Sequence, residues 1–299
     1  MTAAQGGELT RLDDNALRCW PLPSLGDDAD KEARGRVVVI AGSREMPGAA
    51  LLAATAALRA GAGKLVIATV ASAAAAIAIA MPEARVLGLP ETPAGGFDPA
   101  GVRRLEDVVQ TARAVLVGPG MMDAPATLDL VTTLAPWLRG RAAVLDALAM
   151  DVITRLGRFE EPTLLTPHAG EMAHLTGLSK DAIQDDPVHV AQEFAQKWNA
   201  VVALKGAQTV IAAPDGRSWL HDGGNAGLAT SGSGDTLAGA IGGLAARGAT
   251  LEQACAWGVV LHARAGEHLA ARLGPVGYLA REIPMEMLAV LRDLEEPRK

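Results

Sequence analysis

Short apolar runs alternate with longer segments of helical periodicity through most of this 299-residue chain. The runs are continuously apolar, which is typical of strands buried on both faces of a parallel sheet. Parallel strands need long crossover connections, usually helices, and the helical segments supply them. The pattern predicts an α/β fold with a mostly parallel central sheet and helices on both faces. The expected strands are 37–41, 65–68, 85–87, 114–117, 143–145, 163–165, 201–204, 209–213 and 218–220.

The organisation along the chain is simple. We expect helices at 49–60, 102–110, 126–138, 170–175 and 187–199, and mostly helical structure from Thr236 onward. Residues 1–35 are polar and irregular, and we expect them to form an N-terminal arm. Residues 36–299 are expected to form a single domain, because no composition shift marks an interdomain linker.

Composition excludes several classes of protein. The net charge of −7 provides no basic footprint for nucleic acid or an anionic membrane. The longest uncharged run, 65–82, is mostly alanine and ends in proline, so we expect a strand and a helix there and no membrane span. The N-terminus lacks a secretory signal, and Cys19 and Cys255 form no cysteine motif. We therefore expect a cytoplasmic protein.

A glycine-rich loop precedes the predicted helix near residue 236. Gly232, Ser233 and Gly234 are small enough to let backbone N–H groups converge, and a helix N-terminus adds partial positive charge. This combination predicts an anion hole for phosphate. Asp235 would repel that phosphate, so its presence there indicates a function, such as accepting a proton from a hydroxyl about to be phosphorylated. Aspartate is also favoured as a helix cap, so the loop alone leaves both roles open.

Polar and small residues also follow several predicted strands, where parallel strands end at one edge of a sheet. They include Gly118-Pro119-Gly120, Asp146, Thr166-Pro167-His168 and Lys205-Gly206. Ligands of open α/β sheets bind beyond this edge, so the convergence predicts a cleft. The first loop, AGSREMPGA, lacks the G-x-G-x-x-G of a dinucleotide-binding fold, and the chain has no Walker A motif.

Six blocks in this order resemble the ADP- or ATP-dependent NAD(P)H-hydrate dehydratases of the ribokinase-like superfamily. They are residues 37–63, VGPG at 117–120, VLDALAM at 144–150, LLTPHAGEMAHLTG at 164–177, ALKGAQTVIAAPDG at 203–216 and NAGLATSGSGDTLAGAIGGLAARG at 225–248. The sequence departs from the family pattern at 44–46, at 121–122 and at Leu148, where the family has a second aspartate. The resemblance implies a stand-alone dehydratase domain and leaves the metal ligands unassigned.

The resemblance also implies a reaction. NADH or NADPH damaged by hydration carries a ring hydroxyl, which the family phosphorylates with ADP or ATP and Mg²⁺ before phosphate is eliminated. Partners would be the hydrated dinucleotide and an adenine nucleotide, and the protein would be a homo-oligomer, a tetramer by resemblance.

The family's functional positions can be carried over residue by residue. Asp235 would be the catalytic base, with Gly232, Ser233 and Gly234 as the anion hole. Positions that would contact the damaged dinucleotide are Ala49, Gly120, His168 and Asp235, and those that would contact the adenine nucleotide are Lys205, Gly206, Ala207, Gln208, Thr209 and Gly234.

Two other functions remain open at this point. A small-molecule kinase of the same superfamily, acting on a sugar or a thiazole alcohol, would keep 232–235 but leave phosphate on its product. A non-catalytic nucleotide sensor would bind nucleotide without turnover.

Overall fold

The computed structural model describes residues 9–24, 26 and 30–295. Its centre is a ten-stranded sheet in the order β1-β10-β9-β8-β7-β6-β5-β2-β3-β4. Neighbouring strands are parallel except where β9 pairs with β8 and β10, so β9 alone among the described strands runs in the opposite direction. The strands are β1 (Leu9–Arg11), β2 (Arg36–Ile40), β3 (Lys64–Val70), β4 (Ala84–Leu89), β5 (Ala114–Val117), β6 (Ala142–Leu145), β7 (Thr163–Leu165), β8 (Ala200–Leu204), β9 (Thr209–Ala212) and β10 (Ser218–His221).

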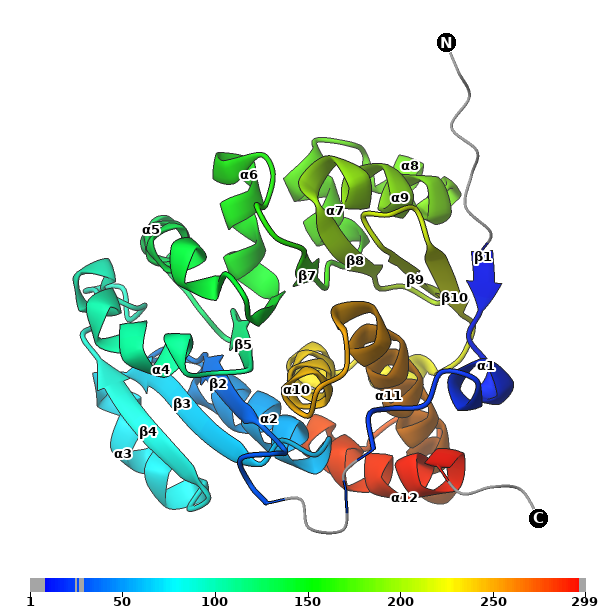
Figure 1. Ribbon diagram of the computed structural model, residues 1–299, viewed down its shortest axis with the longest axis horizontal. Helices are drawn as coiled ribbons and strands as arrows, with labels where there is room; N and C mark the ends of the chain where they lie inside the picture. The colour runs from blue at the N-terminus through cyan, green and yellow to red at the C-terminus, as the bar shows by residue number, and fades with distance from the viewer. Residues whose placement is uncertain (1–8, 25, 27–29, 296–299) are drawn as a thin grey trace.

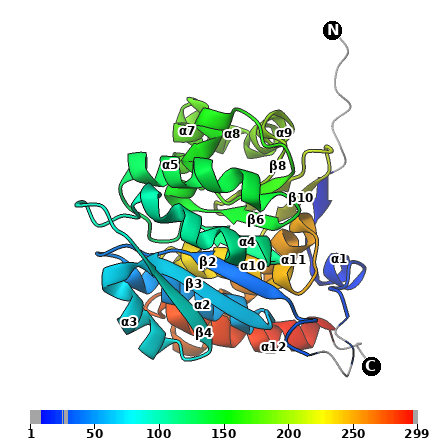
Figure 2. The same ribbon diagram turned by 60° about the vertical axis from the view of Figure 1, so that its left-hand side comes forward.

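Helices cover both faces of the sheet, as predicted. Figure 1 shows α10 and α11 inside the curve of the sheet, with α5, α6 and α9 on its outer side. In Figure 2 the β4 edge comes forward, with α3 beside β3 and β4. The α-helices are α1 (Asp14–Arg18), α2 (Pro47–Arg59), α3 (Ala71–Ala80), α4 (Glu106–Gln110), α5 (Ala124–Leu134), α6 (Val152–Leu156), α7 (Ala169–Thr176), α8 (Lys180–Asp185), α9 (Pro187–Trp198), α10 (Ser233–Ala246), α11 (Leu251–Leu273) and α12 (Ile283–Glu295). Short 3₁₀ helices are η1 (Pro99–Leu105), η2 (Ala135–Leu138), η3 (Ala147–Asp151), η4 (Ala226–Leu228) and η5 (Ala280–Glu282).

Helix α10 is the most enclosed helix of the fold. It packs against α2, α11 and strands β2, β5 and β6. Two glycines face α2 so closely that a Cβ at Gly239 would lie 2.1 Å from the Ala53 carbonyl oxygen, and one at Gly243 would lie 2.2 Å from that of Ala57. The small residues of α10 are therefore required by its close packing against α2.

The predicted strands agree with the structure to within two residues at each end, and β5 and β7 agree at both ends. The N-terminal arm differs from the prediction, because its described part is not irregular. Leu9–Arg11 forms β1 along β10, and Trp20 stacks on Trp219 with 5.4 Å between ring centroids. Residues 1–8, 25 and 27–29 of the predicted arm lie outside the described residues.

Among the helices of the described residues, none combines the length and the apolar character that crossing a membrane requires.

The packing of α10 predicts different outcomes for two alanine substitutions on the same helix. Gly239→Ala places a methyl group on a backbone carbonyl of α2 and should lower the free energy of unfolding by roughly 1–3 kcal/mol. Gly242→Ala is the control, because the nearest atom to its new Cβ would be the Leu116 Cβ at 3.6 Å, an ordinary contact. It should be neutral or stabilise the helix by up to about 1 kcal/mol. Urea denaturation measures both, and equal effects would contradict the proposed contact.

Candidate active site

The carboxyl ends of β5, β6, β7 and β8 and the first turn of α10 bring most of the predicted site residues to one rim of the sheet. The loops after β7 and β8 continue side by side beyond the strands, since His168 and Lys205 form a parallel bridge and the Lys205 N–H donates to the Pro167 carbonyl at 2.8 Å. Gly118, which follows β5, allows the loop after β6 to approach closely, because a Cβ at 118 would lie 1.8 Å from the Asp146 carbonyl oxygen.

Lys205 is the central cation of this rim. Its Nζ lies 3.4 Å from Asp146 Oδ1 and 3.9 Å from Glu171 Oε2, and its side chain is only 20% exposed. Burial alone would lower the pKa of Lys205, but Asp146, Glu171 and Asp235 together outweigh burial and hold the pKa above its ordinary value. Lys205 is therefore a fixed positive charge.

Asp146 is the most deeply buried carboxylate of the rim, with its side chain 5% exposed. The Thr166 hydroxyl donates to Asp146 Oδ1 at 2.6 Å, so this oxygen has two partners. Asp146 and Thr166 were expected at this rim because they directly follow β6 and β7, but no role was predicted for them or for Glu171 of α7. Asp146 and Glu171 pair with Lys205, and Thr166 joins the cluster through its bond to Asp146.

Asp235 lies in the first turn of α10, close enough to this cluster to be coupled to it. Burial, and then the negative charge of Asp146, raise the pKa of Asp235 to about 6, while Lys205 opposes the rise. A carboxylate with this pKa accepts protons more readily than an exposed aspartate and is still ionised near pH 7. These are the properties of a general base.

The glycine loop meets α10 with Gly232 in a left-handed conformation, at φ +87°. A Cβ at Gly232 would lie 2.4 Å from Leu52 Cδ1 of α2, so glycine is required here for two reasons. The Ser233 N–H donates to the Thr230 carbonyl at 3.2 Å. The N–H groups of Gly234 and Asp235 have no acceptor among the described residues and are the donors of this turn left for an anion.

Gly234 faces Lys205 directly. A Cβ at Gly234 would lie 3.6 Å from Lys205 Nζ. The helix N-terminus and the ammonium group thus combine their positive charge at one point, which suits a phosphate.

Ala49 and Gly120 lie against each other at the same rim. Gly120 has φ +64°, and a Cβ there would lie 2.4 Å from the Ala49 Cβ. Ala49 is in the first turn of α2, the helix that contacts Gly232 through Leu52. The two predicted substrate contacts are therefore neighbours in space although they are far apart in sequence.

His168 caps α7 with its side chain. Its Nδ1 accepts hydrogen bonds from the N–H groups of Gly170 and Glu171, each at 3.0 Å. A neutral imidazole that accepts at Nδ1 carries its proton on Nε2. This Nε2 lies 3.7 Å from Glu171 Oε2, beyond hydrogen-bond distance, and the His168 side chain is 59% exposed, so a ligand can reach the N–H.

The segment Gly206, Ala207 and Gln208 forms the turn between antiparallel strands β8 and β9, and Thr209 begins β9. The predicted nucleotide segment is thus an exposed turn that directly follows Lys205.

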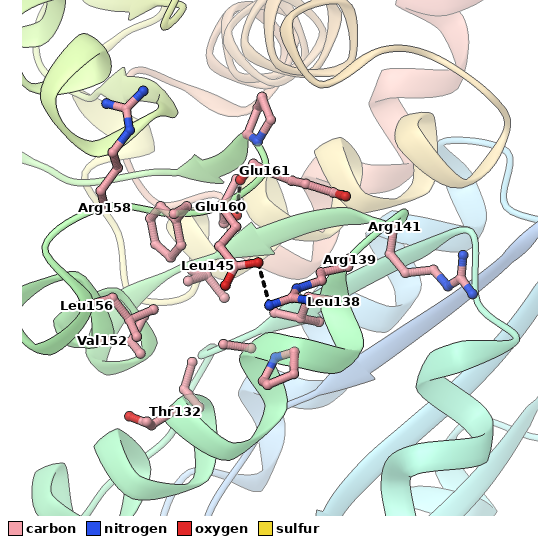
Figure 3. A pocket seen from close by; sticks show the side chains of 16 residues that line it. Thr132, Leu138, Arg139, Arg141, Leu145, Val152, Leu156, Arg158, Glu160 and Glu161 are labelled. Carbon is pink, nitrogen blue, oxygen red and sulfur yellow. Dashed lines mark hydrogen bonds and ion pairs between the residues drawn. The ribbon is translucent and has the colours of Figure 1, made fainter.

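A separate cavity of about 290 Å³ lies at the opposite edge of the sheet, before β6 and β7 begin. Figure 3 shows it between α5, α6 and the segment leading to β7, with Arg139 and Glu160 paired at one side. No predicted site residue lines this cavity.

The described residues contain no group of three or more histidine, cysteine, aspartate or glutamate side chains arranged to hold a metal ion by themselves.

Comparison with known proteins identifies the family. The family model described as NAD(P)H-hydrate dehydratase matches residues 37–287. The chain belongs to the NAD(P)H-hydrate dehydratase family. It is 51% identical over 278 residues to the ADP-dependent (S)-NAD(P)H-hydrate dehydratase of Xanthomonas campestris pv. campestris, covering 92% of this chain and 94% of that protein. The chain spans about half the length of the bifunctional NAD(P)H-hydrate repair enzymes that it also matches.

Solved structures of similar proteins confirm the fold class. The Bacillus subtilis ADP/ATP-dependent NAD(P)H-hydrate dehydratase, co-crystallised with ATP and Mg²⁺, superposes with a TM-score of 0.82 at 31% identity over 96% of this chain and 99% of that chain. A ribokinase-like superfamily protein from Enterococcus faecalis V583 gives a TM-score of 0.83 at 27% identity over 99% of each chain. The predicted ribokinase-like fold is therefore confirmed, whereas the role of each site residue in this dehydratase-family chain stays a prediction.

The environment of Asp235 predicts a pH-dependent gain in stability for Asp235→Asn. The native pKa of about 6 lies above the value of about 3.9 expected in the unfolded chain. Ionised Asp235 therefore destabilises the native state fully above pH 6, and the effect vanishes below about pH 4, where both states are protonated. Asp235→Asn should raise Tm at pH 7.5, and the gain should fade as the pH falls to 4. Thermal melts at both values test this, and a gain that is independent of pH would contradict it.

Proposed function

We propose that this protein repairs NADH and NADPH that have been hydrated on the nicotinamide ring, using ADP or ATP. The observation that carries the proposal is the Asp235 carboxylate, with its raised pKa, in the first turn of α10 beside Lys205. This arrangement places a base and an anion site together, as transfer of a phosphoryl group to a hydroxyl requires. The names of the relatives specify the hydroxyl compound as NAD(P)H hydrate and the donor as ADP, or ADP and ATP.

The reaction has two steps. The ring hydroxyl oxygen attacks the terminal phosphorus of ADP or ATP, Asp235 accepts the hydroxyl proton, and AMP or ADP leaves. The ring C–O bond then breaks, phosphate departs with the former hydroxyl oxygen, and the neighbouring ring carbon loses a proton, which restores the double bond. The net chemistry is loss of water coupled to cleavage of one phosphoanhydride bond.

Most of the predicted residues have a place in this reaction. The N–H groups of Gly234 and Asp235 stabilise charge on the transferring phosphoryl group, whereas the predicted donor at Ser233 is already bonded to the Thr230 carbonyl. Lys205 contributes a fixed positive charge, and the turn at 206–209 contacts the adenine nucleotide. Ala49 and Gly120 form a small, close-packed surface for the dinucleotide, and the exposed Nε2–H of His168 donates to it.

Mg²⁺ fits this site as a companion of the nucleotide. Magnesium commonly takes its ligands from phosphate oxygens, water and one or two carboxylates. Asp146 and Glu171 are the rim carboxylates beside Lys205 that would complete its coordination. When bound, the ion would neutralise phosphate charge.

The two alternatives that sequence alone left open are less favoured. A kinase that leaves phosphate on a sugar or a thiazole alcohol lacks support among relatives of high identity, which are named as dehydratases. A nucleotide sensor has no use for a buried base beside the phosphate site, because the carboxylate would only repel the ligand.

The proposal extends to assembly and location. The solvent face of α3 carries no charged residue, and its Ile79 is 84% exposed, which supports a homo-oligomer, a tetramer by resemblance. Sedimentation analysis tests this, and a monomer at all concentrations would exclude it. Cys19 and Cys255 are free thiols, which suits the cytoplasm. Cell fractionation tests the location, and recovery in an extracellular fraction would exclude it.

Asp235→Asn tests the proposed chemistry. Asparagine matches aspartate in size but cannot accept the hydroxyl proton, so turnover of hydrated NADH with ADP or ATP should fall at least about 10²-fold. Nucleotide binding should survive or tighten, because a negative charge beside the phosphates is removed. The returning absorbance of the reduced ring measures the rate, and titration calorimetry measures binding.

Asp181→Asn is the matched control, because Asp181 is an exposed aspartate in the first turn of another helix, α8. It should leave turnover unchanged. Retention of wild-type turnover by Asp235→Asn within a few-fold would end the assignment of Asp235 as the base. Failure of the wild-type protein to convert hydrated NADH would end the proposed function.

A further inference from the structure

His262 is a buried histidine that lies behind the anion site. It belongs to α11, and its Nε2 lies 3.0 Å from Ser233 Oγ and 3.1 Å from the Ser233 carbonyl oxygen. Ser233 is the first residue of α10, in the middle of the glycine loop. A helix other than α10 therefore holds the turn on which the anion hole is built.

The contact with the carbonyl favours the tautomer of His262 that carries its proton on Nε2. A carbonyl oxygen only accepts hydrogen bonds, so in that tautomer Nε2 donates to it at 3.1 Å. Burial lowers the pKa of His262 to about 4, so the ring is neutral near pH 7. His262 is thus a neutral donor near pH 7, where the Asp235 carboxylate is ionised.

The Ser233 carbonyl and the Gly234 N–H belong to the same peptide group. A trans peptide is planar, and its C=O and N–H point in opposite directions. The Ser233 carbonyl already takes part in the first turn of α10, and the bond from His262 adds a second restraint on the same peptide, and therefore on the Gly234 N–H. That N–H has no acceptor among the described residues, and Gly234 faces Lys205 Nζ.

We propose that His262 is a positioning residue that aims the Gly234 N–H at the transferring phosphoryl group through the Ser233–Gly234 peptide. Donation to the carbonyl also polarises the peptide, which makes the N–H at its other end a stronger donor. His262 itself touches neither substrate nor nucleotide in this scheme. The inference rests on the proposed function for its catalytic consequence, but the orientation of the peptide does not depend on it.

Two substitutions at position 262 distinguish a positioning role of His262 from a role in packing alone. In His262→Gln the amide nitrogen is the same number of bonds from Cβ as the imidazole Nε2, so it can donate to the same carbonyl. In His262→Asn the amide nitrogen is one bond closer to the backbone and falls short. Gln253→Leu is the control, because Gln253 is a buried residue of the same helix whose side chain donates to the Trp20 and Pro21 carbonyls, away from the rim.

The measurements are kcat and nucleotide KM for dehydration of hydrated NADH, and the ¹⁵N–¹H resonance of Gly234 in each protein. His262→Asn should lower kcat by about tenfold or more. The loss should not exceed the ~10²–10³-fold decrease in kcat that follows outright removal of an oxyanion-hole donor. Its nucleotide KM should change little, and its Gly234 resonance should move. His262→Gln should restore kcat and the resonance, and Gln253→Leu should lower stability alone.

Equal loss of kcat in the Asn and Gln variants, or an unmoved Gly234 resonance in His262→Asn, would overturn the inference. A wild-type protein that is inactive toward hydrated NADH would instead overturn the proposed function. In that case the resonance still decides whether His262 orients the peptide.

Discussion

The close approach of α10 to α2 is the contact on which the rest of the site depends. Backbone carbonyls of Ala53 and Ala57 occupy the space where side chains at 239 and 243 would lie, so the two helices touch through backbone. This approach carries the first turn of α10 to the rim of the sheet. It also seats Gly232 on Leu52, one turn from Ala49. A packing constraint in the core therefore holds the first turn of α10 and the first turn of α2 in one rigid frame.

The net negative charge at the rim explains why nucleotide binding at this site requires an additional cation. Lys205 is surrounded by the carboxylates of Asp146, Glu171 and Asp235, so the cluster is negative before any phosphate arrives. The helix N-terminus offsets part of this, and a metal ion carried by the nucleotide would offset more. Burial, and then the negative charge of Asp146, raise the pKa of Asp235, which lowers stability and makes this carboxylate a stronger proton acceptor. This is the usual exchange of stability for function at active sites.

The parts of the structure that depend on local sequence pattern were predictable from the sequence. The strands were predictable because buried parallel strands are continuously apolar, as β5 and β7 are. Strand β1 was missed because Leu9–Arg11 is exposed, so its place in the sheet comes from its pairing with β10 and not from an apolar pattern. Asp235 and Lys205 stood in recognisable motifs. The partnership of Asp146 with Lys205 joins residues 59 apart, and His262 lies mid-helix, 29 residues from Ser233. Contacts of this kind arise from tertiary packing, so no local sequence pattern predicts them.

The proposed reaction requires the ring hydroxyl to leave as part of a phosphate. Hydrated NADH labelled with ¹⁸O in that hydroxyl tests this requirement, by mass spectrometry of the inorganic phosphate and the water formed during turnover with ADP or ATP. Attack of the hydroxyl oxygen on phosphorus, followed by cleavage of the ring C–O bond, predicts that the label appears in phosphate. Recovery of the label in water, with unlabelled phosphate, would show that the hydroxyl is expelled without being phosphorylated and would exclude the proposed reaction.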